Sequence, residues 1–272
     1  MIKLGVNSVL FKKYDFATAA KAIKTAGYDG VEISGIQGMC EHLNLETWKA
    51  DKLNLKAISD GLELPFLSTE IASLDRERLL KAFEACAEIG IPVVNVGPGG
   101  KAGDDESLKQ TIETLTARAE DAAEFGVTLC CKAHVGSSVH DTPTTLKMIE
   151  GVNHPNFGVD MDPSHIFRAG ENPAEALPAV IKGMKHIHIR DCKGPGPSPG
   201  APQNQACGRG DIDLWGYLRA VVENNYKGPV CLEVIGPDQE LVDAAIIAAE
   251  SYGYMNAILK SFGHTAKVVR GR

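Results

Sequence analysis

Short apolar runs alternate with longer segments of helical periodicity, and this alternation constrains the fold more than any other feature. Eight runs have the character of buried strands: 3–7, 30–33, 63–68, 92–97, 128–134, 157–162, 186–191 and 229–234. Amphipathic helical spacing follows each of them, at 15–26, 45–60, 75–89, 105–125, 142–151, 173–182, 214–224 and 241–262. Strict alternation is typical of parallel sheets. Eight units favour a closed ring over an open doubly wound sheet, so we predict an α/β fold, a (β/α)8 TIM barrel in a single domain.

The length of 272 residues suits one such barrel, because these barrels occupy about 250 residues. We place the barrel domain at 1–263 and a C-terminal tail at 264–272. The seven cysteines show no Cys-x-x-Cys pair, and the first residues enter a strand without a targeting signal. Both features predict a reducing, cytoplasmic location.

Charge and hydropathy exclude some classes of partner. The net charge is -7, and Lys and Arg are scattered rather than clustered, so we expect no nucleic-acid partner. We also expect no membrane partner, since the sequence has no long apolar stretch at its start. A small molecule is the expected partner, and a homo-oligomer is compatible with the sequence.

One segment interrupts the alternation. Residues 193–211 are too rich in Gly and Pro for a regular element, and they follow the seventh predicted strand. A long loop in a compact domain is usually functional or disordered. We favour a substrate lid at the barrel mouth over a passive linker, because no second domain follows.

Ionisable side chains gather at the ends of the last four predicted strands: Lys132, His134, Asp160, Asp162, His186, His188, Arg190 and Glu233. Burying charges in a barrel costs several kcal/mol each unless they are paired or ligated. Asp162, His188 and Glu233 form a mixed nitrogen and oxygen set that suits Mn²⁺, Mg²⁺, Co²⁺ or Zn²⁺. We therefore predict a divalent metal site, with Asp160 and His186 as buried supports.

Five segments in this order resemble the xylose-isomerase-like sugar isomerase and epimerase superfamily, which also includes dehydratases and an endonuclease branch. They are Gly-Tyr-Asp-Gly-Val-Glu-Ile at 27–33, Gly-Val-Asp-Met-Asp-Pro-Ser-His at 158–165, His-Ile-His-Ile-Arg-Asp at 186–191, Gly-Arg-Gly-Asp-Ile-Asp at 208–213 and Cys-Leu-Glu-Val at 231–234. The resemblance implies that Asp162, His188 and Glu233 are three of four metal ligands. It also implies that His165 contacts the substrate.

The fourth ligand of that family is a glutamate in a Glu-x-His pattern on the fifth strand, where this chain has Lys132-Ala133-His134. Lysine removes one of two carboxylate bases and adds an ammonium beside a cation. We expect Lys132 either to have a lowered pKa, and then to act as acid or base, or to turn toward an anionic group of the substrate. A third possibility is that catalysis or metal binding has been lost.

The leading hypothesis is metal-assisted isomerase or epimerase chemistry on a small keto sugar or sugar acid, through an enediolate. Glu233, Lys132 and His165 are the predicted catalytic residues, and His134, His165, Arg190 and Arg209 are predicted to bind substrate. Side chains at three other strand ends, Glu32, Glu70 and Asn95, are equally compatible with substrate contact and with a structural role.

Three alternatives remain. A lyase that decarboxylates a 3-oxo sugar acid, or eliminates a β-substituent, needs an electron sink and one proton delivery, which a metal and one lysine supply. A non-catalytic sugar-binding barrel would bind without turnover. The endonuclease branch needs further histidine ligands, and Asn95 stands where one is expected.

Overall fold

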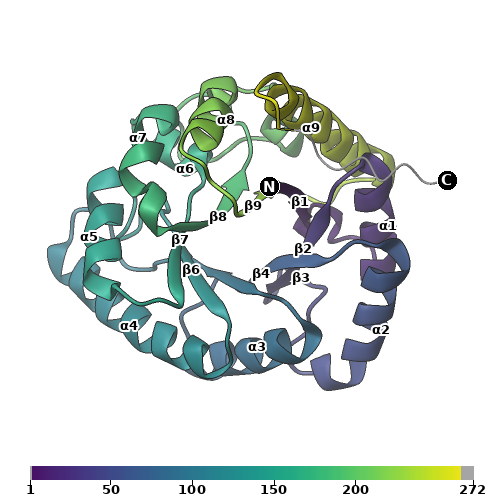
Figure 1. Cartoon of the computed structure of the whole chain (residues 1–272), viewed down its shortest axis with the longest axis horizontal. Coiled ribbons are helices and arrows are strands. Elements are labelled where there is room, and N and C mark those ends of the chain that lie inside the picture. The colour runs from purple at the N-terminus through teal and green to yellow at the C-terminus, as the bar shows by residue number, and fades with distance from the viewer. Residues whose placement is uncertain (1, 265–272) are drawn as a thin grey trace.

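The computed structural model describes residues 2–264 and confirms the predicted barrel. Eight parallel strands form its ring: β1 (Lys3–Asn7), β2 (Gly30–Ile36), β4 (Phe66–Glu70), β5 (Val93–Val96), β6 (Thr128–Lys132), β7 (Phe157–Asp160), β8 (Met184–Ile189) and β9 (Pro229–Leu232). The pairing of β1 with both β2 and β9 closes the ring (Figure 1). A two-residue strand, β3 (Cys40–Glu41), pairs antiparallel with β2 outside the ring.

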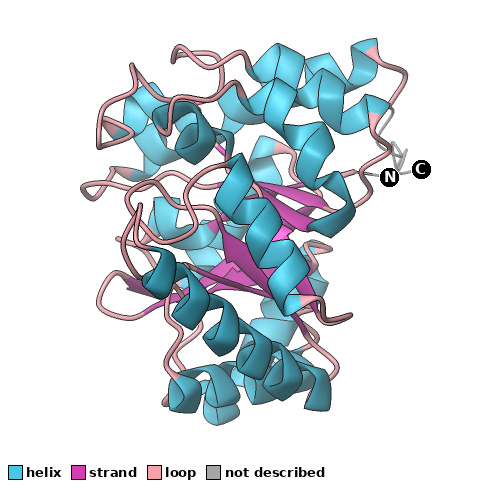
Figure 2. Cartoon of the chain, turned by 90° about the vertical axis from the view of Figure 1, so that its left-hand side faces the viewer, coloured by secondary structure: helices cyan, strands magenta, loops and turns pink. Residues whose placement is uncertain are grey.

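Helices surround the ring of strands (Figure 2). They are α1 (Phe16–Ala26), α2 (Trp48–Leu62), α3 (Arg76–Ile89), α4 (Asp105–Glu124), α5 (Thr142–Val152), α6 (Pro163–Arg168), α7 (Pro173–Val180), α8 (Leu214–Glu223) and α9 (Leu241–Ser261). Three short 3-10 helices are η1 (Ser8–Phe11), η2 (Ile181–Gly183) and η3 (Pro202–Gln205). Many helices begin after an aspartate whose carboxylate accepts a bond from a backbone N–H of the first turn. These caps are Asp15, Asp75, Asp104, Asp141, Asp162 and Asp213.

The element boundaries differ from the predicted ones where capping decides them. The predicted strand at 63–68 is wrong at its start, because Glu63 ends α2 in a left-handed conformation with φ 48°. The strand β4 therefore begins at Phe66 and extends to Glu70. The sequence also missed α6, a six-residue helix that Asp162 begins two residues after β7 ends.

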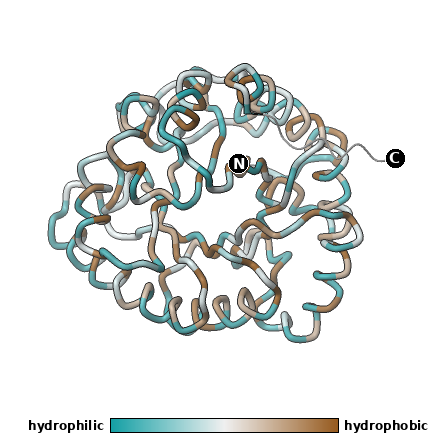
Figure 3. Tube along the Cα trace, viewed as in Figure 1, coloured by the Kyte–Doolittle hydropathy of each residue, from teal (hydrophilic) through white to brown (hydrophobic). Residues whose placement is uncertain are grey.

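The buried apolar residues of the strands and of the surrounding helices form one core cluster. Figure 3 shows apolar residues recurring along the strands and alternating with polar residues along the helices. Gly30 marks a close approach in the ring, because a Cβ there would lie 2.6 Å from Leu67 Cγ and 2.7 Å from the Pro65 carbonyl oxygen. Such tight contacts exclude a larger residue at this position.

The two ends of the described chain lie together, since the Ile2 N–H donates to His264 Nε2 at 2.8 Å. Apart from His264, the predicted tail at 264–272 lies outside the described residues. Within residues 2–264, no helix combines the length and the apolar character that crossing a membrane requires.

Candidate active site

The parallel register brings the polar ends of neighbouring strands together. Lys132 on β6 stands beside Asp160 on β7, Asp160 stands beside His186 on β8, and His188 stands beside Cys231 on β9. Side chains of a barrel strand alternate between inside and outside, so His186 and His188 both point inward. We call the mutually paired Glu32, Asp160, His186 and His188 the deep layer. The upper layer, toward the mouth, consists of Glu70, Lys132, Asp162, Arg190 and Glu233.

In the deep layer, two histidines bridge two carboxylates, and all four side chains are fully buried. His186 contacts Asp160 through Nδ1 at 2.9 Å and Glu32 through Nε2 at 3.1 Å. His188 contacts the same two carboxylates through Nδ1 and Nε2, each at 2.5 Å. Burial alone would lower the pKa of each histidine, but Asp160 and Glu32 raise the pKa of His188, and Asp160 raises that of His186. The group is an internally balanced set of charges.

Glu32 is the centre of this layer. Its Oε1 accepts from Asn7 Nδ2 at 2.5 Å, and its Oε2 accepts from Asn95 Nδ2 at 2.8 Å and from the Ser68 hydroxyl. Together with the two histidines, these donors satisfy both carboxylate oxygens, as buried charges require. For Glu32 and Asn95, the structure therefore favours a structural role, one of the two that the sequence left open.

In the upper layer, Lys132 reaches across the mouth to two carboxylates. Its Nζ lies 2.9 Å and 3.0 Å from the two oxygens of Glu233 and 3.8 Å from Glu70 Oε2. Burial alone would lower the pKa of Lys132, but Glu233 and Glu70 raise it above its usual value. Of the alternatives that the sequence left open for Lys132, this arrangement does not favour a lowered pKa, because the protein's own carboxylates hold Lys132 as an ammonium.

Arg190 forms ion pairs with two carboxylates of the upper layer, those of Asp162 and Glu233. Its Nη2 lies 3.1 Å from Asp162 Oδ2, and its Nη1 lies 3.0 Å from Glu233 Oε2. The Nε group donates to Ser164 Oγ at 2.8 Å, and that hydroxyl donates to Asp162 Oδ1 at 2.7 Å. Asp162 thus caps α6 with one oxygen and holds Arg190 with the other.

The two upper glutamates have different acidities. Burial raises the pKa of Glu70 to about 7, although Lys132 opposes the shift. Burial would also raise the pKa of Glu233, but the charges of Lys132, His188 and Arg190 lower it to about 2. Glu70 therefore exchanges a proton near neutral pH, and Glu233 stays ionised while it holds Lys132.

Two histidines form one wall of the site. The rings of His134 and His165 lie 4.1 Å apart between centroids. The Val135 N–H donates to His165 Nδ1 at 3.1 Å, and Arg190 Nη2 lies 2.9 Å from its Nε2. Burial and the neighbouring cations lower the pKa of both histidines, with Arg190 acting on His165 and Lys132 on His134. Both are neutral rings suited to hydrogen bonds with hydroxyl or carbonyl groups.

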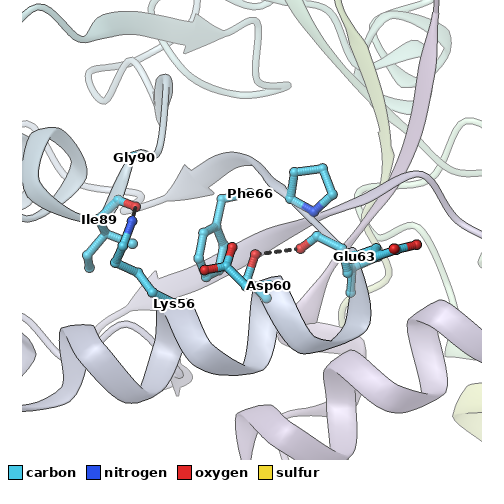
Figure 4. A pocket seen from close by; sticks show the side chains of 9 residues that line it. Lys56, Asp60, Glu63, Phe66, Ile89 and Gly90 are labelled. Atoms are coloured by element: carbon cyan, nitrogen blue, oxygen red, sulfur yellow. Dashed lines mark hydrogen bonds between the residues drawn. The ribbon is translucent and has the colours of Figure 1, made fainter.

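A cavity of about 280 Å³ opens above the upper layer. Its polar wall consists of Glu70, Lys132, His134, Ser137, His165, Arg190 and Glu233, and its apolar wall includes Ile36, Met39 and Ile235. Asp162 and His188 lie beneath these residues, fully buried. A larger hollow of about 470 Å³, lined by Lys56, Asp60 and Phe66 among others (Figure 4), lies at the opposite end of the barrel, where strands begin. None of the residues of the deep or upper layer lines this hollow.

Two predictions concern residues that do not line the cavity in this structure. Arg209, a predicted substrate-binding residue, pairs with Glu250 on α9 through Nε at 2.8 Å and is not among the described residues that line the cavity. The loop 193–211 contributes none of the described residues that line the cavity. Gln205 of this loop bonds the backbone N–H and carbonyl of Ile235, and the Pro197 carbonyl accepts from Arg168 Nη1. In this structure the loop lies beside the mouth, and its role as a substrate lid stays a prediction.

Several buried groups have the composition of a metal site. Three sets of atoms within the described residues lie close enough to share one ion: Glu32, His186 and Cys231; Asp160, His186 and His188; and Glu32, Glu70 and His188. The predicted set of Asp162, His188 and Glu233 is not among them. Both nitrogens of His188 face carboxylates, and Lys132 and Arg190 hold Glu233 and Asp162. The predicted set does not fit an ion in this arrangement.

The fold and these residues match one family. The family model described as xylose isomerase-like TIM barrel matches residues 20–256, which is most of the chain. The chain belongs to this family, as its sequence motifs implied.

Relatives found by sequence comparison are named for several different activities. The 3-dehydroshikimate dehydratase of Bacillus anthracis is 20% identical over 176 residues, covering 61% of this chain and 62% of the relative. This chain thus spans about three fifths of that relative's length. The inosose dehydratase of Clostridium beijerinckii is 21% identical over 268 residues, covering 85% and 89%. A D-allulose 3-epimerase from Methylomonas sp., solved in complex with D-allulose, superposes with a TM-score of 0.75 at 16% identity, covering 94% and 96%.

Proposed function

We propose that this chain is a cytoplasmic enzyme that removes a proton beside the carbonyl of a small keto sugar or sugar acid and forms an enediolate or enolate. Its family includes relatives named as epimerases and as dehydratases, and both reactions share this first step. The observation that carries the proposal is the set of ionised groups facing one cavity. Lys132 and Arg190 supply the positive charge that such an anionic intermediate needs, and Glu70 and Glu233 supply proton acceptors.

The different pKa values of Glu70 and Glu233 support different catalytic roles for these two carboxylates. Glu70, with its pKa near 7, is suited to take a proton from carbon and to return it, because acid-base catalysis works best when the pKa lies near the operating pH. Glu233 becomes a second proton acceptor when Lys132 turns from it to the substrate. Lys132 and Arg190 then stabilise the negative oxygen of the intermediate, and His134 and His165 bond substrate hydroxyls.

The two outcomes differ in the second step. In isomerisation or epimerisation, the proton returns to carbon, at the neighbouring atom or on the opposite face. In β-elimination, the enolate expels a hydroxyl group, Lys132 donates the proton, and water leaves as a carbon-carbon double bond forms. The ammonium favours this lyase branch, since it offers a proton where the family's pattern has a carboxylate base.

Deuterium exchange separates these outcomes. The protein is incubated in D2O with a ketose panel that includes D-allulose, and with cyclic 3-oxo compounds that include an inosose and 3-dehydroshikimate, and proton NMR follows each mixture. Deuterium in a product with an unchanged carbon-oxygen framework identifies an isomerase or epimerase. New alkene protons with loss of water identify a lyase. Saturable binding with neither change would overturn the proposal in favour of a non-catalytic sugar-binding barrel.

A divalent ion on Asp162, His188 and Glu233 is the second arrangement that we consider for the same chemistry. It is favoured by Asp162 Oδ2 and His188 Nδ1, which are buried atoms without a hydrogen-bond partner in the described chain. Such an ion would supply a Lewis acid beside the substrate oxygens. It requires Lys132 and Arg190 to release both carboxylates, so the steps above use the protein's own cations.

A further inference from the structure

We propose that Lys132, assisted by Arg190, is a built-in cation that takes the place of a divalent metal ion, so that the site works without one. The inference rests on the proposed function for its catalytic meaning. Its physical content, that the site rejects metal because of one lysine, stands on the geometry of the upper layer and is tested separately.

The first step is the position of the ammonium. Lys132 Nζ contacts both oxygens of Glu233, at 2.9 Å and 3.0 Å, and its side chain is only 6% exposed. A divalent ion bound by Glu233 would lie about 2.0–2.2 Å from the same oxygens. The ion and the ammonium would then share one small volume and repel each other, so only one of them can occupy it.

The second step concerns the other two predicted ligands. Arg190 lies 3.1 Å from Asp162 and 3.0 Å from Glu233 and thereby joins these carboxylates with one guanidinium. His188 has a carboxylate oxygen 2.5 Å from each ring nitrogen, Glu32 at Nε2 and Asp160 at Nδ1, and its Nδ1 also lies 3.7 Å from Glu70 Oε2. Each predicted ligand already has a cationic or anionic partner from the chain itself.

The third step is the charge around the cavity floor. Two fixed cations, Lys132 and Arg190, face the carboxylates of Glu70, Asp162 and Glu233. A divalent ion added to this set would leave an excess of positive charge in a buried place, which is costly. A carboxylate at position 132 would reverse the balance and leave an excess of negative charge that a divalent ion offsets.

The replacement also changes what the cation can do. An ammonium carries half the charge of a divalent ion, so it polarises a carbonyl less strongly. Unlike the ion, it donates a proton, and the proton can pass directly to a departing hydroxyl group. A site built on Lys132 is therefore better suited to elimination than to a purely Lewis-acid reaction.

The test compares metal binding by the wild-type chain, Lys132→Glu and Lys132→Met. Each is purified without a metal-binding tag or chelator, analysed by elemental mass spectrometry, and titrated with Mn²⁺ and Zn²⁺ by calorimetry and thermal unfolding. We expect wild-type protein with almost no metal and no change in Tm with Mn²⁺ or EDTA. Lys132→Glu should bind about one ion per chain and gain Tm with Mn²⁺. Lys132→Met removes the ammonium without adding a ligand, and it should bind much more weakly than Lys132→Glu.

Several results would overturn the inference. Wild-type protein with about one ion per chain and a Tm lowered by EDTA shows that the lysine coexists with a metal. A folded Lys132→Glu that gains no ion shows that the lysine does not stand in the metal's place. If Lys132→Glu does not fold, the wild-type titration alone decides. Failure of the proposed function appears instead as an inactive wild-type chain in D2O, whatever the metal content.

Discussion

The deep and upper layers of the barrel both pair carboxylates with cationic groups, but the deep layer uses histidines and the upper layer uses Lys132 and Arg190. Below, Glu32 and Asp160 hold His186 and His188, every member is fully buried, and a ring of ion pairs connects them. Above, Lys132, Arg190 and the upper carboxylates face a cavity. Contact with the cavity, together with the presence of lysine and arginine, therefore distinguishes the upper set of charges from the deep one.

Unsatisfied atoms occur in both layers. Glu70 Oε2, Asp162 Oδ2 and Arg190 Nη1 are buried in the upper layer without a hydrogen-bond partner of good geometry, and so are Asp160 Oδ2 and His188 Nδ1 in the deep layer. Glu32 has no such atom among the described contacts, since five donors converge on it. A group with unused bonding capacity beside a cavity can interact with a ligand, whereas a saturated group can only be disrupted.

The largest expected effect is on the deep layer. Glu32→Ala leaves His186 and His188 buried with one carboxylate between them, and it removes the acceptor of Asn7 and Asn95. Breaking a buried charge network by removing one partner costs about 3–5 kcal/mol of unfolding free energy. Urea unfolding measures the loss, with Glu113→Ala on the exposed face of α4 as control. A loss near zero would show that the deep layer does not stabilise the fold.

The next effect should appear in activity. Glu233→Gln removes a proposed proton acceptor and the main partner of Lys132 but leaves Glu70 and Asp162 to hold the two cations. We expect the rate with a substrate identified in D2O to fall by about 10²–10⁴-fold. The loss of unfolding free energy should be smaller than for Glu32→Ala. Equal rates for the variant and the wild type would show that Glu233 takes no part in the reaction. The upper layer would then not differ from the deep layer in the way proposed.

A pH dependence follows from Glu70. Burial raises its pKa in the folded chain from 4.5 to about 7, so its stabilising contribution is complete below pH 4.5 and is lost as the pH rises through 7. Glu70→Gln lacks this loss. Relative to wild type, its unfolding free energy should rise across this window, by on the order of 1–2 kcal/mol. Urea unfolding at several pH values measures the difference, and a constant difference would contradict the raised pKa.

The sequence predicted much of this arrangement because periodicity fixes which strand faces point inward. The alternation of His186, His188 and Arg190 placed all three inside the ring, and Asp160 and His186 are the buried supports that were expected. Family membership follows from the same motifs. What the sequence could not supply is which groups pair. It gave Glu70 no more weight as a substrate contact than as a structural residue, since only the folded barrel brings this side chain from β4 to Lys132 on β6.

The path of the long loop at 193–211 is the second feature that the sequence could not predict. Glycine and proline at 193–211 predict an irregular segment, but they say nothing about the direction in which it runs. That direction depends on specific anchors such as Gln205, whose side chain bonds Ile235, and Asp191, whose carboxylate accepts from Gly208 and Ile212. No local pattern reveals these contacts. The pairing of Arg209 with Glu250 is a contact of the same kind.

The smallest effect is expected for Arg209, which belongs to neither layer. Arg209→Ala removes a pair with Glu250 in which both side chains are 38% exposed. Exposed ion pairs contribute about 0.2–1 kcal/mol, because water screens them and ordering two long side chains costs entropy. We therefore expect a slight loss of stability in urea, reduced further by salt, and unchanged kcat and KM. A KM raised several-fold would show that the loop moves Arg209 to the substrate during the reaction. Loop residues would then bind the substrate together with the upper layer.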